Sequence, residues 1–207
     1  MICPGYKTIY NDTYARDISK KVRSHLLVKM ANGENTKAFV SYGFKKDPNN
    51  KNNILIDYNV SHIVEKIHDM FYEGVNKTQI AKYLTEQKIK TPSDYKKSTT
   101  KYYNPHSKTG QWSVNMITKI LRDRSVVGDL VLHQYTKINY KVDKVVKVPK
   151  GKQIIIEGHH PAIVDRKIFE ANQRRLDIQS NNWNYTTHKK SATHLLRGLV
   201  FCHQCRQ

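Results

Sequence analysis

Residues 74–129 decide the fold, because they contain two short segments with the apolar spacing of a helix. The first reads Thr78-Gln-Ile-Ala-Lys-Tyr-Leu-Thr-Glu-Gln87, and the second reads Trp112-Ser-Val-Asn-Met-Ile-Thr-Lys-Ile-Leu-Arg122. The apolar residues at helical spacing are Ile80, Ala81 and Leu84 in the first segment and Val114, Ile117, Ile120 and Leu121 in the second. Such a pattern buries one face of each helix. The sequence therefore predicts two short helices, one packed on the other.

Helix-breaking and helix-capping residues separate these two segments. Thr91-Pro92-Ser93 is expected to end the first helix, because proline cannot continue a helix and restricts the residue before it. A polar loop is expected next, and its lysines are Lys96, Lys97, Lys101 and Lys108. Ser113 is expected to cap the second helix, since its hydroxyl can accept a hydrogen bond from a free backbone N–H group.

The outer face of the second predicted helix carries Asn115, Lys119 and Arg122. Long polar side chains on a short helix that packs on another helix are typical of proteins that insert a helix into the DNA major groove. A plain helical hairpin with a solvated basic face has the same pattern. This stretch alone leaves both interpretations open.

The composition favours a polyanionic partner. The 207 residues contain 36 lysines and arginines against 17 aspartates and glutamates, a net charge of +19, with a pI of about 9.8. Such an excess promotes nucleic-acid binding through phosphate contacts and counterion release; a merely soluble, lysine-rich protein is the alternative. Three cysteines, an odd number, indicate a reducing, cytoplasmic compartment. No apolar run is long enough to cross a membrane, and no signal-peptide pattern is present.

Residues 6–31 are predicted to form one long helix that ends at Asn32-Gly33. Its apolar residues recur at every fourth position, which gives a slowly winding stripe of Tyr10, Tyr14, Ile18, Val22, Leu26 and Met30. We expect this stripe to pack on a neighbouring domain or a partner helix. The basic face is a candidate for contacts along DNA phosphates.

Residues 34–53 are expected to be extended and loosely ordered. They contain Tyr42-Gly-Phe-Lys45-Lys46, in which aromatic and basic side chains are mixed. Such a segment either tracks a DNA groove, with Tyr42, Lys45 and Lys46 as contacts, or is an ordinary tether between domains.

Residues 54–56 are a short strand candidate, and residues 60–72 have the clearest amphipathic helical pattern in the chain. Its apolar positions are Val60, Ile63, Val64, Ile67, Met70 and Phe71. We expect this helix to belong to the core, with His62 and His68 on the surface rather than bound to a metal.

A basic β-ribbon is predicted after the helical pair. Residues 128–134 and 153–157 are expected to be strands, and apolar and polar residues alternate through 138–148 as in a half-exposed strand. Between Thr136 and Gln153 lie six lysines and one aspartate, and the lysines expected to contact DNA are Lys141, Lys144 and Lys147. The ribbon is interpreted as a wing laid against phosphates, in preference to an edge strand guarded by lysines.

The C-terminal part of the sequence offers half of a metal site. His159-His160-Pro161 is expected to be a loop, Asp165 the cap of a following helix, and residues 179–191 a polar linker. Cys202-His-Gln-Cys205 is half of a structural zinc site, which needs four ligands. Because the sequence has no second Cys-x-x-Cys, we do not expect a complete zinc site in this chain. We expect no other cofactor either.

In this order, the motifs resemble the large serine recombinases, the site-specific integrases of phages and conjugative transposons. The matching stretches cover nearly the whole chain after residue 6. They are Tyr14-Ala-Arg-Asp-Ile-Ser-Lys-Lys-Val22, Tyr42-Gly-Phe-Lys-Lys-Asp47, Thr78-Gln-Ile-Ala-Lys-Tyr-Leu84, Ile89-Lys-Thr-Pro92, residues 112–130, Glu157-Gly-His-His-Pro-Ala-Ile-Val164 and Leu195-Leu-Arg-Gly-Leu-Val-Phe-Cys202. The sequence departs from the family pattern at Ser41, at Asp123-Arg124 and at Arg206.

The resemblance implies an α+β fold in three parts. Residues 1–33 look like the long linker helix that leaves the family's catalytic domain and supports dimer contacts. Residues 34–178 look like the recombinase DNA-binding domain, with a winged-helix-like helical unit and a basic β-ribbon. Residues 179–207 look like a linker and the start of a truncated zinc ribbon, with Cys202 and Cys205 as a half site. The family's catalytic serine and arginines precede the long helix, so no catalytic residue is assigned.

The expected function is binding of attachment-site duplex DNA by a segment of a site-specific serine recombinase that integrates or excises a mobile element. The chain alone is not expected to be an enzyme, whereas the intact parent would cut DNA with a serine and could bind zinc. Self-association through the N-terminal helix is expected, and no membrane partner. The alternatives are a stand-alone winged-helix regulator that dimerises through residues 6–30, and a non-functional remnant of a recombinase gene.

Overall fold

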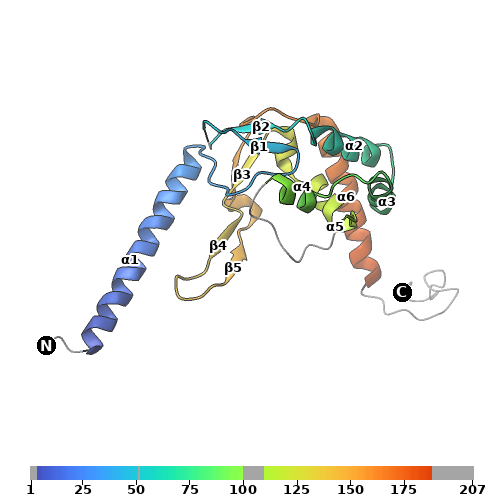
Figure 1. Cartoon of the computed structure of the whole chain (residues 1–207). Helices are drawn as coiled ribbons and strands as arrows, with labels where there is room; N and C mark the ends of the chain where they lie inside the picture. Colours follow the sequence, from blue (N-terminus) through green and yellow to red (C-terminus); the bar gives the residue numbers. More distant parts are fainter. Residues whose placement is uncertain (1–3, 51, 100–109, 188–207) are drawn as a thin grey trace, which may run out of the picture. The chain divides into compact units, whose positions relative to one another are not determined.

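The structure is a computed structural model that describes residues 4–50, 52–99 and 110–187 (Figure 1). Its architecture is mixed α+β, as the sequence predicts. The helices are α1 (Pro4–Ala31), α2 (Ser61–Tyr72), α3 (Lys77–Glu86), α4 (Pro92–Thr99), α5 (Val114–Arg122) and α6 (Arg166–Thr187), with short 3₁₀ turns η1 (Arg124–Val127) and η2 (Lys150–Lys152). The strands are β1 (Phe44–Lys46), β2 (Ile54–Ile56), β3 (Leu130–Leu132), β4 (Tyr135–Lys137), β5 (Val145–Lys147) and β6 (Ile154–Ile156). The chain divides into two compact units, residues 1–172 and 173–207, and α6 crosses the boundary.

Helices α2, α3 and α5 pack on one another and form the helical core. The side chains that are fully buried in them include Val64, Ile67 and Phe71 on α2, Ile80 and Leu84 on α3, and Ile117 and Leu121 on α5. Both helices predicted within residues 74–129 are therefore confirmed. Val114, predicted to be buried, is 38% exposed. It is the first residue of α5 and lies at the rim of a shallow groove that Thr78 and Lys82 also line, so the packed face begins one turn later.

The prediction that His68 lies on the surface is wrong. The side chain of His68 is fully buried, whereas that of His62 on the same helix is exposed. The reason is that the start of α6 covers a second face of α2. The Asn172 side-chain amide donates to the His68 carbonyl at 3.0 Å, and the Phe169 ring centroid lies 6.0 Å from that of His68.

Helix α4 occupies part of the predicted polar loop, because Pro92 begins a helix as well as ending the preceding one. Proline suits the first helical position, where its missing N–H group would have no partner in any case. Thr91 caps this helix, since its hydroxyl accepts from the Asp94 backbone N–H at 3.2 Å and donates to the Asp94 carboxylate at 2.6 Å. Lys96 and Lys97 therefore lie on a helix.

Residues 34–53 are not a loosely ordered linker, which corrects the sequence-based expectation. β1 pairs with β2 in antiparallel register, with Phe44 opposite Ile56. Phe44 and Ile54 are buried together with Leu130 and Leu132 of β3. A strand of three residues is too short to display a period-two pattern, and its pairing is visible only in three dimensions.

The basic ribbon is one long hairpin with an interruption. β3 pairs with β6, with Leu130 opposite Ile156, and β4 pairs with β5, with Tyr135 opposite Lys147. Between the two pairs the ladder is broken by η2 on one arm and on the other by His133, whose φ is +53°. The single strand predicted through 138–148 is therefore wrong, because residues 138–144 connect β4 to β5 and only 145–147 are strand. The alternation of apolar and polar residues continues through this connection and hides the turn.

The two halves of the hairpin differ in burial. In the inner half, Leu130, Val131 and Leu132 of β3 are all buried in the core. In the outer half, every residue of β4 and β5 is exposed or half-buried. The inner half therefore anchors the hairpin, and β4 and β5 of the outer half extend away from the helical core (Figure 1). Lys137 and Lys147 of this outer half are exposed.

Asp129 ties the end of the helical core to α6. Its carboxylate is fully buried and accepts hydrogen bonds from Arg124 at 2.8 Å and from Arg166 at 2.7 Å. The preceding Gly128 has a φ of +88°, and a Cβ there would lie 2.5 Å from the carbonyl oxygen of His160. His160 is in a loop, as predicted, but it is buried, and its Nε2 lies 2.8 Å from the Ser125 carbonyl oxygen.

Helix α6 begins where Asp165 was predicted to cap it, and the Lys167 backbone N–H donates to the Asp165 carboxylate at 2.8 Å. The helix runs to Thr187, so residues 179–187 of the expected linker are helical. This segment contains neither glycine nor proline to end the helix.

Several predictions concern residues outside the described ranges. They are Lys101, Lys108, Cys202, Cys205 and the end of the expected linker at 188–191. Among the helices that the structure describes, none is long and apolar enough to cross a membrane.

Candidate nucleic-acid interface

The outward face of α5 carries the three side chains predicted to read DNA. Asn115, Lys119 and Arg122 are all exposed, and they share one face because they are spaced at i, i+4 and i+7. The opposite face, with Ile117, Ile120 and Leu121, is buried against the helical core. The structure therefore brings these three predicted residues together on a helix whose position is fixed by packing.

The start of α5 is held by local hydrogen bonds. The Ser113 hydroxyl accepts from the Met116 backbone N–H at 3.3 Å, which confirms the predicted cap. The Trp112 backbone N–H donates to the Thr85 hydroxyl at 3.1 Å, and the Trp112 indole donates to the Ile89 carbonyl at 2.9 Å. These bonds connect the residue that precedes α5 to the C-terminal end of α3 and the residues after it. They therefore fix the position of α5 relative to α3.

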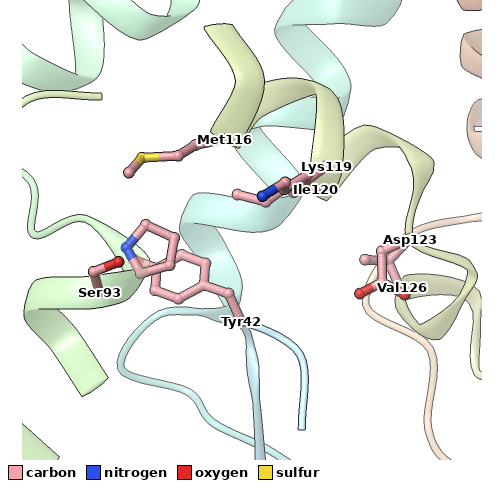
Figure 2. A pocket seen from close by; sticks show the side chains of 8 residues that line it. Tyr42, Ser93, Met116, Lys119, Ile120, Asp123 and Val126 are labelled. Carbon is pink, nitrogen blue, oxygen red and sulfur yellow. The ribbon is translucent and has the colours of Figure 1, made fainter. Parts of the chain in front are cut away.

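A pocket of about 320 Å³ lies beside α5. Its lining residues are Tyr42, Pro92, Ser93, Met116, Lys119, Ile120, Asp123 and Val126. Figure 2 shows Met116, Lys119 and Ile120 of α5 on one side and Tyr42 and Ser93 on another. The walls of the pocket are mainly aliphatic and aromatic, but they include the Lys119 ammonium and the Asp123 carboxylate. The pocket therefore borders the polar face of α5 and is not uniformly basic.

Tyr42, predicted as a DNA contact, lies in an aromatic cluster. Its ring meets those of Tyr95 and Trp112 edge to face, each with centroids 6.0 Å apart. Its hydroxyl donates to the Lys90 carbonyl at 3.3 Å, and burial raises the pKa of Tyr42 above its usual value. The described contacts of Tyr42 are thus internal, and its DNA contact stays a prediction.

The two lysines of β1 differ in their surroundings. Lys45 is exposed, whereas the Lys46 ammonium donates to the Lys37 carbonyl at 2.5 Å. Lys37 is half-buried, and desolvation lowers the pKa of its ammonium group. Lys45 is therefore accessible to a ligand, whereas the Lys46 ammonium already makes a hydrogen bond within the chain.

The lysines of the outer hairpin, Lys141, Lys144 and Lys147, are exposed and lie on β5 or in the 138–144 connection. Lys141 pairs with Asp12 of α1 at 2.9 Å, and the Tyr140 hydroxyl donates to the same carboxylate at 2.8 Å. The hydrogen bond from Lys141, and then that from Tyr140, lowers the pKa of Asp12, and the hydrogen bond to Asp12 raises the pKa of Lys141. The sequence carries no local signal for these contacts; Tyr140 and Asp12, for example, are 128 positions apart.

Metal binding is not supported within the described ranges, where no three His, Cys, Asp or Glu side chains form a group that could hold an ion. The predicted half site of Cys202 and Cys205 lies outside these ranges and stays a prediction.

Comparison with models of protein families identifies one family. The model of the family described as Recombinase matches residues 59–179, which is more than half of the chain. A solved structure described as a crystal structure of an LSR–DNA complex resembles the chain with a TM-score of 0.47 and 17% sequence identity, over 88% of this chain and 47% of that chain. The chain thus spans about half the length of that solved protein. No curated protein shows a significant match.

The family match covers α2 to the middle of α6, which includes the three-helix core, the hairpin and the candidate face of α5. It confirms the resemblance to the large serine recombinases that the sequence motifs carry. The chain belongs to the Recombinase family.

Proposed function

We propose that this chain is a DNA-binding segment of a site-specific serine recombinase, and that it binds the attachment-site duplex during integration or excision of a mobile element. The observation that carries the proposal is the geometry of α5. Its apolar face is buried on α2 and α3, and its exposed face presents Asn115, Lys119 and Arg122. A packed helix with such a face fits the width of the DNA major groove.

In this proposal the elements have separate roles. Asn115, Lys119 and Arg122 read base edges, since amide and cationic side chains form the usual pairs with adenine and guanine. Lys45 and the hairpin lysines Lys141, Lys144 and Lys147 contact phosphates and fix the register, as the wing of a winged-helix domain does.

The proposed organisation follows from these roles. Residues 1–33 serve as a linker helix, residues 34–178 as the DNA-binding domain, and residues 179–207 as a linker and zinc-ribbon start. Since α6 runs from Arg166 to Thr187, the second boundary falls within a helix rather than in a loop. Zinc bound by Cys202 and Cys205 would require ligands beyond this pair.

Selection from a pool of random duplexes tests the proposal, because the target sequence need not be known. The full chain is expected to enrich a sequence, and replacing Asn115, Lys119 and Arg122 together with alanine is expected to reduce enrichment while weak non-specific binding remains. Lys82→Ala is the matched control, since Lys82 is an exposed lysine of α3 that pairs with Glu86 at 3.8 Å. Absence of any duplex binding at low salt would overturn the proposal.

Catalysis is proposed only for the parent recombinase, in which a serine attacks the phosphodiester and the strands are rejoined. For these 207 residues we expect binding without cleavage. Incubation with supercoiled DNA that carries a selected site is expected to leave the plasmid intact. Nicked or linear products formed by the purified chain would contradict this assignment.

Self-association through α1 is a second proposal, and one observation favours it. The side chains of the predicted stripe at Tyr10, Tyr14, Ile18, Val22 and Leu26 are between 41% and 62% exposed. A second copy of α1 would bury them, which is favourable. Sedimentation equilibrium is expected to show dimers that Ile18→Glu weakens and Lys21→Glu does not; a monomer at all concentrations would refute the contact.

A further inference from the structure

The outer hairpin has two chemically different faces, which its register defines. Tyr135 lies opposite Lys147, and Lys137 lies opposite Val145. Because side chains alternate along a strand and directly opposed residues point to the same side, these four residues share one face. Thr136 and Val146 lie opposite each other on the other face. We call the first set the Tyr135 face.

The Tyr135 face is the exposed one. Tyr135 is 62% exposed and Val145 is 53% exposed, and both lysines of this face are also exposed. Thr136 and Val146 are half-buried. The hairpin therefore exposes Tyr135 and Val145 to solvent, together with two lysines. In a half-buried ribbon the apolar side chains normally face the core and the polar ones face solvent, so this arrangement is reversed.

The connection at the tip continues this mixture. Ile138 is 54% exposed and Val142 is 50% exposed, and Lys141 and Lys144 are near them in sequence. The preference of β-branched residues for strands explains Val145, but it does not explain Ile138 and Val142, which lie outside the strands. Loop tips are usually polar, so four exposed apolar side chains on one small hairpin indicate a surface that is covered in a complex.

The charge identifies the kind of partner. The segment 135–147 carries four lysines and one aspartate, which pairs with Lys137 at 2.6 Å. An uncharged protein surface would not require these lysines. A two-stranded ribbon fits the DNA major groove, where lysines reach the phosphates at the groove edges and apolar side chains contact sugars and thymine methyl groups.

We propose that the Tyr135 face is a duplex-DNA contact surface in which Tyr135 and Val145 contact sugar and base atoms while Lys147 contacts a phosphate. This inference rests on the proposed DNA-binding function and deepens it, because it assigns the apolar residues and the orientation of the hairpin. In this arrangement the Lys137 ammonium, which pairs with Asp143, lies on the same face and near the duplex.

Salt titration of duplex binding separates the two kinds of contact. For the full chain, Lys147→Gln is expected to reduce the slope of log affinity against log salt by about 0.9, the value for one phosphate contact. The double variant Tyr135→Ser with Val145→Thr is expected to weaken binding about tenfold at every salt concentration without changing the slope. Val146→Thr, on the opposite face of the same strand, is the matched control and is expected to bind like the unmodified chain.

Each outcome bears on a different claim. If the unmodified chain binds no duplex, the proposed function falls, and the inference with it. If it binds duplex and the double variant binds equally well, the inference alone is wrong. Equal losses of binding to anionic lipid vesicles in the same variants would assign the Tyr135 face to a membrane surface instead.

A second measurement keeps the inference testable if the double variant does not fold. A photoreactive amino acid at position 135 is expected to crosslink to bound duplex, and the same group at position 146 is not. Crosslinking of equal yield at both positions, or at position 146 alone, would overturn the assignment of the face.

Discussion

Replacing His68 with leucine is expected to remove much of the acid sensitivity of the fold. The imidazole of His68 is fully buried between α2 and the start of α6, and burial lowers its pKa to about 4. The Asn172 amide donates to the carbonyl of His68 and lies 3.4 Å from its Nδ1. The loss of hydration outweighs a backbone hydrogen bond to Ile120 and the charge of Asp123, which both favour the protonated ring. In the unfolded chain the imidazole has its ordinary pKa of about 6.5.

The sign and the size of the effect follow from these two pKa values. Between about pH 6.5 and pH 4 the unfolded state binds a proton that the folded state does not, so the free energy of unfolding falls as the pH is lowered. The contribution is fully present above about pH 6.5 and is lost toward pH 4. At about 1.4 kcal/mol for each pKa unit, the total is roughly 3 kcal/mol. The pKa of His160 is also lowered by burial, which adds in the same direction and makes a comparison with a variant necessary.

Urea unfolding followed by circular dichroism measures this difference. With a urea dependence of roughly 2 kcal/mol per molar, the unmodified chain is expected to lose about 1 M or more in its unfolding midpoint between neutral pH and about pH 4.5. His68→Leu is expected to lose much less, because it cannot bind the proton. His62→Gln, on the exposed face of the same helix, is expected to behave like the unmodified chain. A His68→Leu variant that loses stability with acid as steeply as the unmodified chain would refute the reasoning.

Substitutions at three further positions test the packing and capping around α5, each by urea unfolding. Gly128→Ala is expected to destabilise the fold by more than about 2 kcal/mol, because a Cβ at φ +88° would lie 2.5 Å from the His160 carbonyl oxygen; an effect below about 0.5 kcal/mol would contradict this. Ser113→Ala is expected to cost about 1 kcal/mol by removing the cap of α5, and Ser113→Asp is expected to retain stability. Asp129→Asn is expected to cost roughly 1–3 kcal/mol, because two part-exposed arginines lose a buried acceptor charge, and unchanged stability would show that the pair contributes little.

The sequence predicts the elements whose signal is local. The apolar spacing of α2, α3 and α5 follows from the helical period, and that spacing appears directly in the order of residues. The capping roles of Ser113 and Asp165 are equally local, because each side chain binds a backbone group a few positions away. For the same reason, the exposure of Asn115, Lys119 and Arg122 follows once Ile117, Ile120 and Leu121 are buried.

The errors concern features that depend on distant partners. His68 looks like a surface residue from the pattern of α2 alone, and it is buried only because Phe169 and Asn172, about a hundred positions later, cover it. β1 looks like part of a linker because its partner is another three-residue strand, and its core side chain Phe44 meets residues of β3. Pro92 is a local exception, because the same residue that ends one helix also suits the first position of the next.

The amino-acid order alone determines that this protein has a short helix with an exposed polar face, a strongly basic chain and the motifs of the Recombinase family, since periodicity, composition and motif order need no contact between distant residues. Only the tertiary structure decides that the predicted basic ribbon is anchored in the core through β3 and that Tyr135 and Val145 share a face with its lysines. It also decides that Tyr42 and Lys46 make hydrogen bonds within the chain. The physical reason is that strand pairing and burial depend on which segments meet in space. The register between two distant strands cannot be inferred from the spacing of apolar residues within either strand.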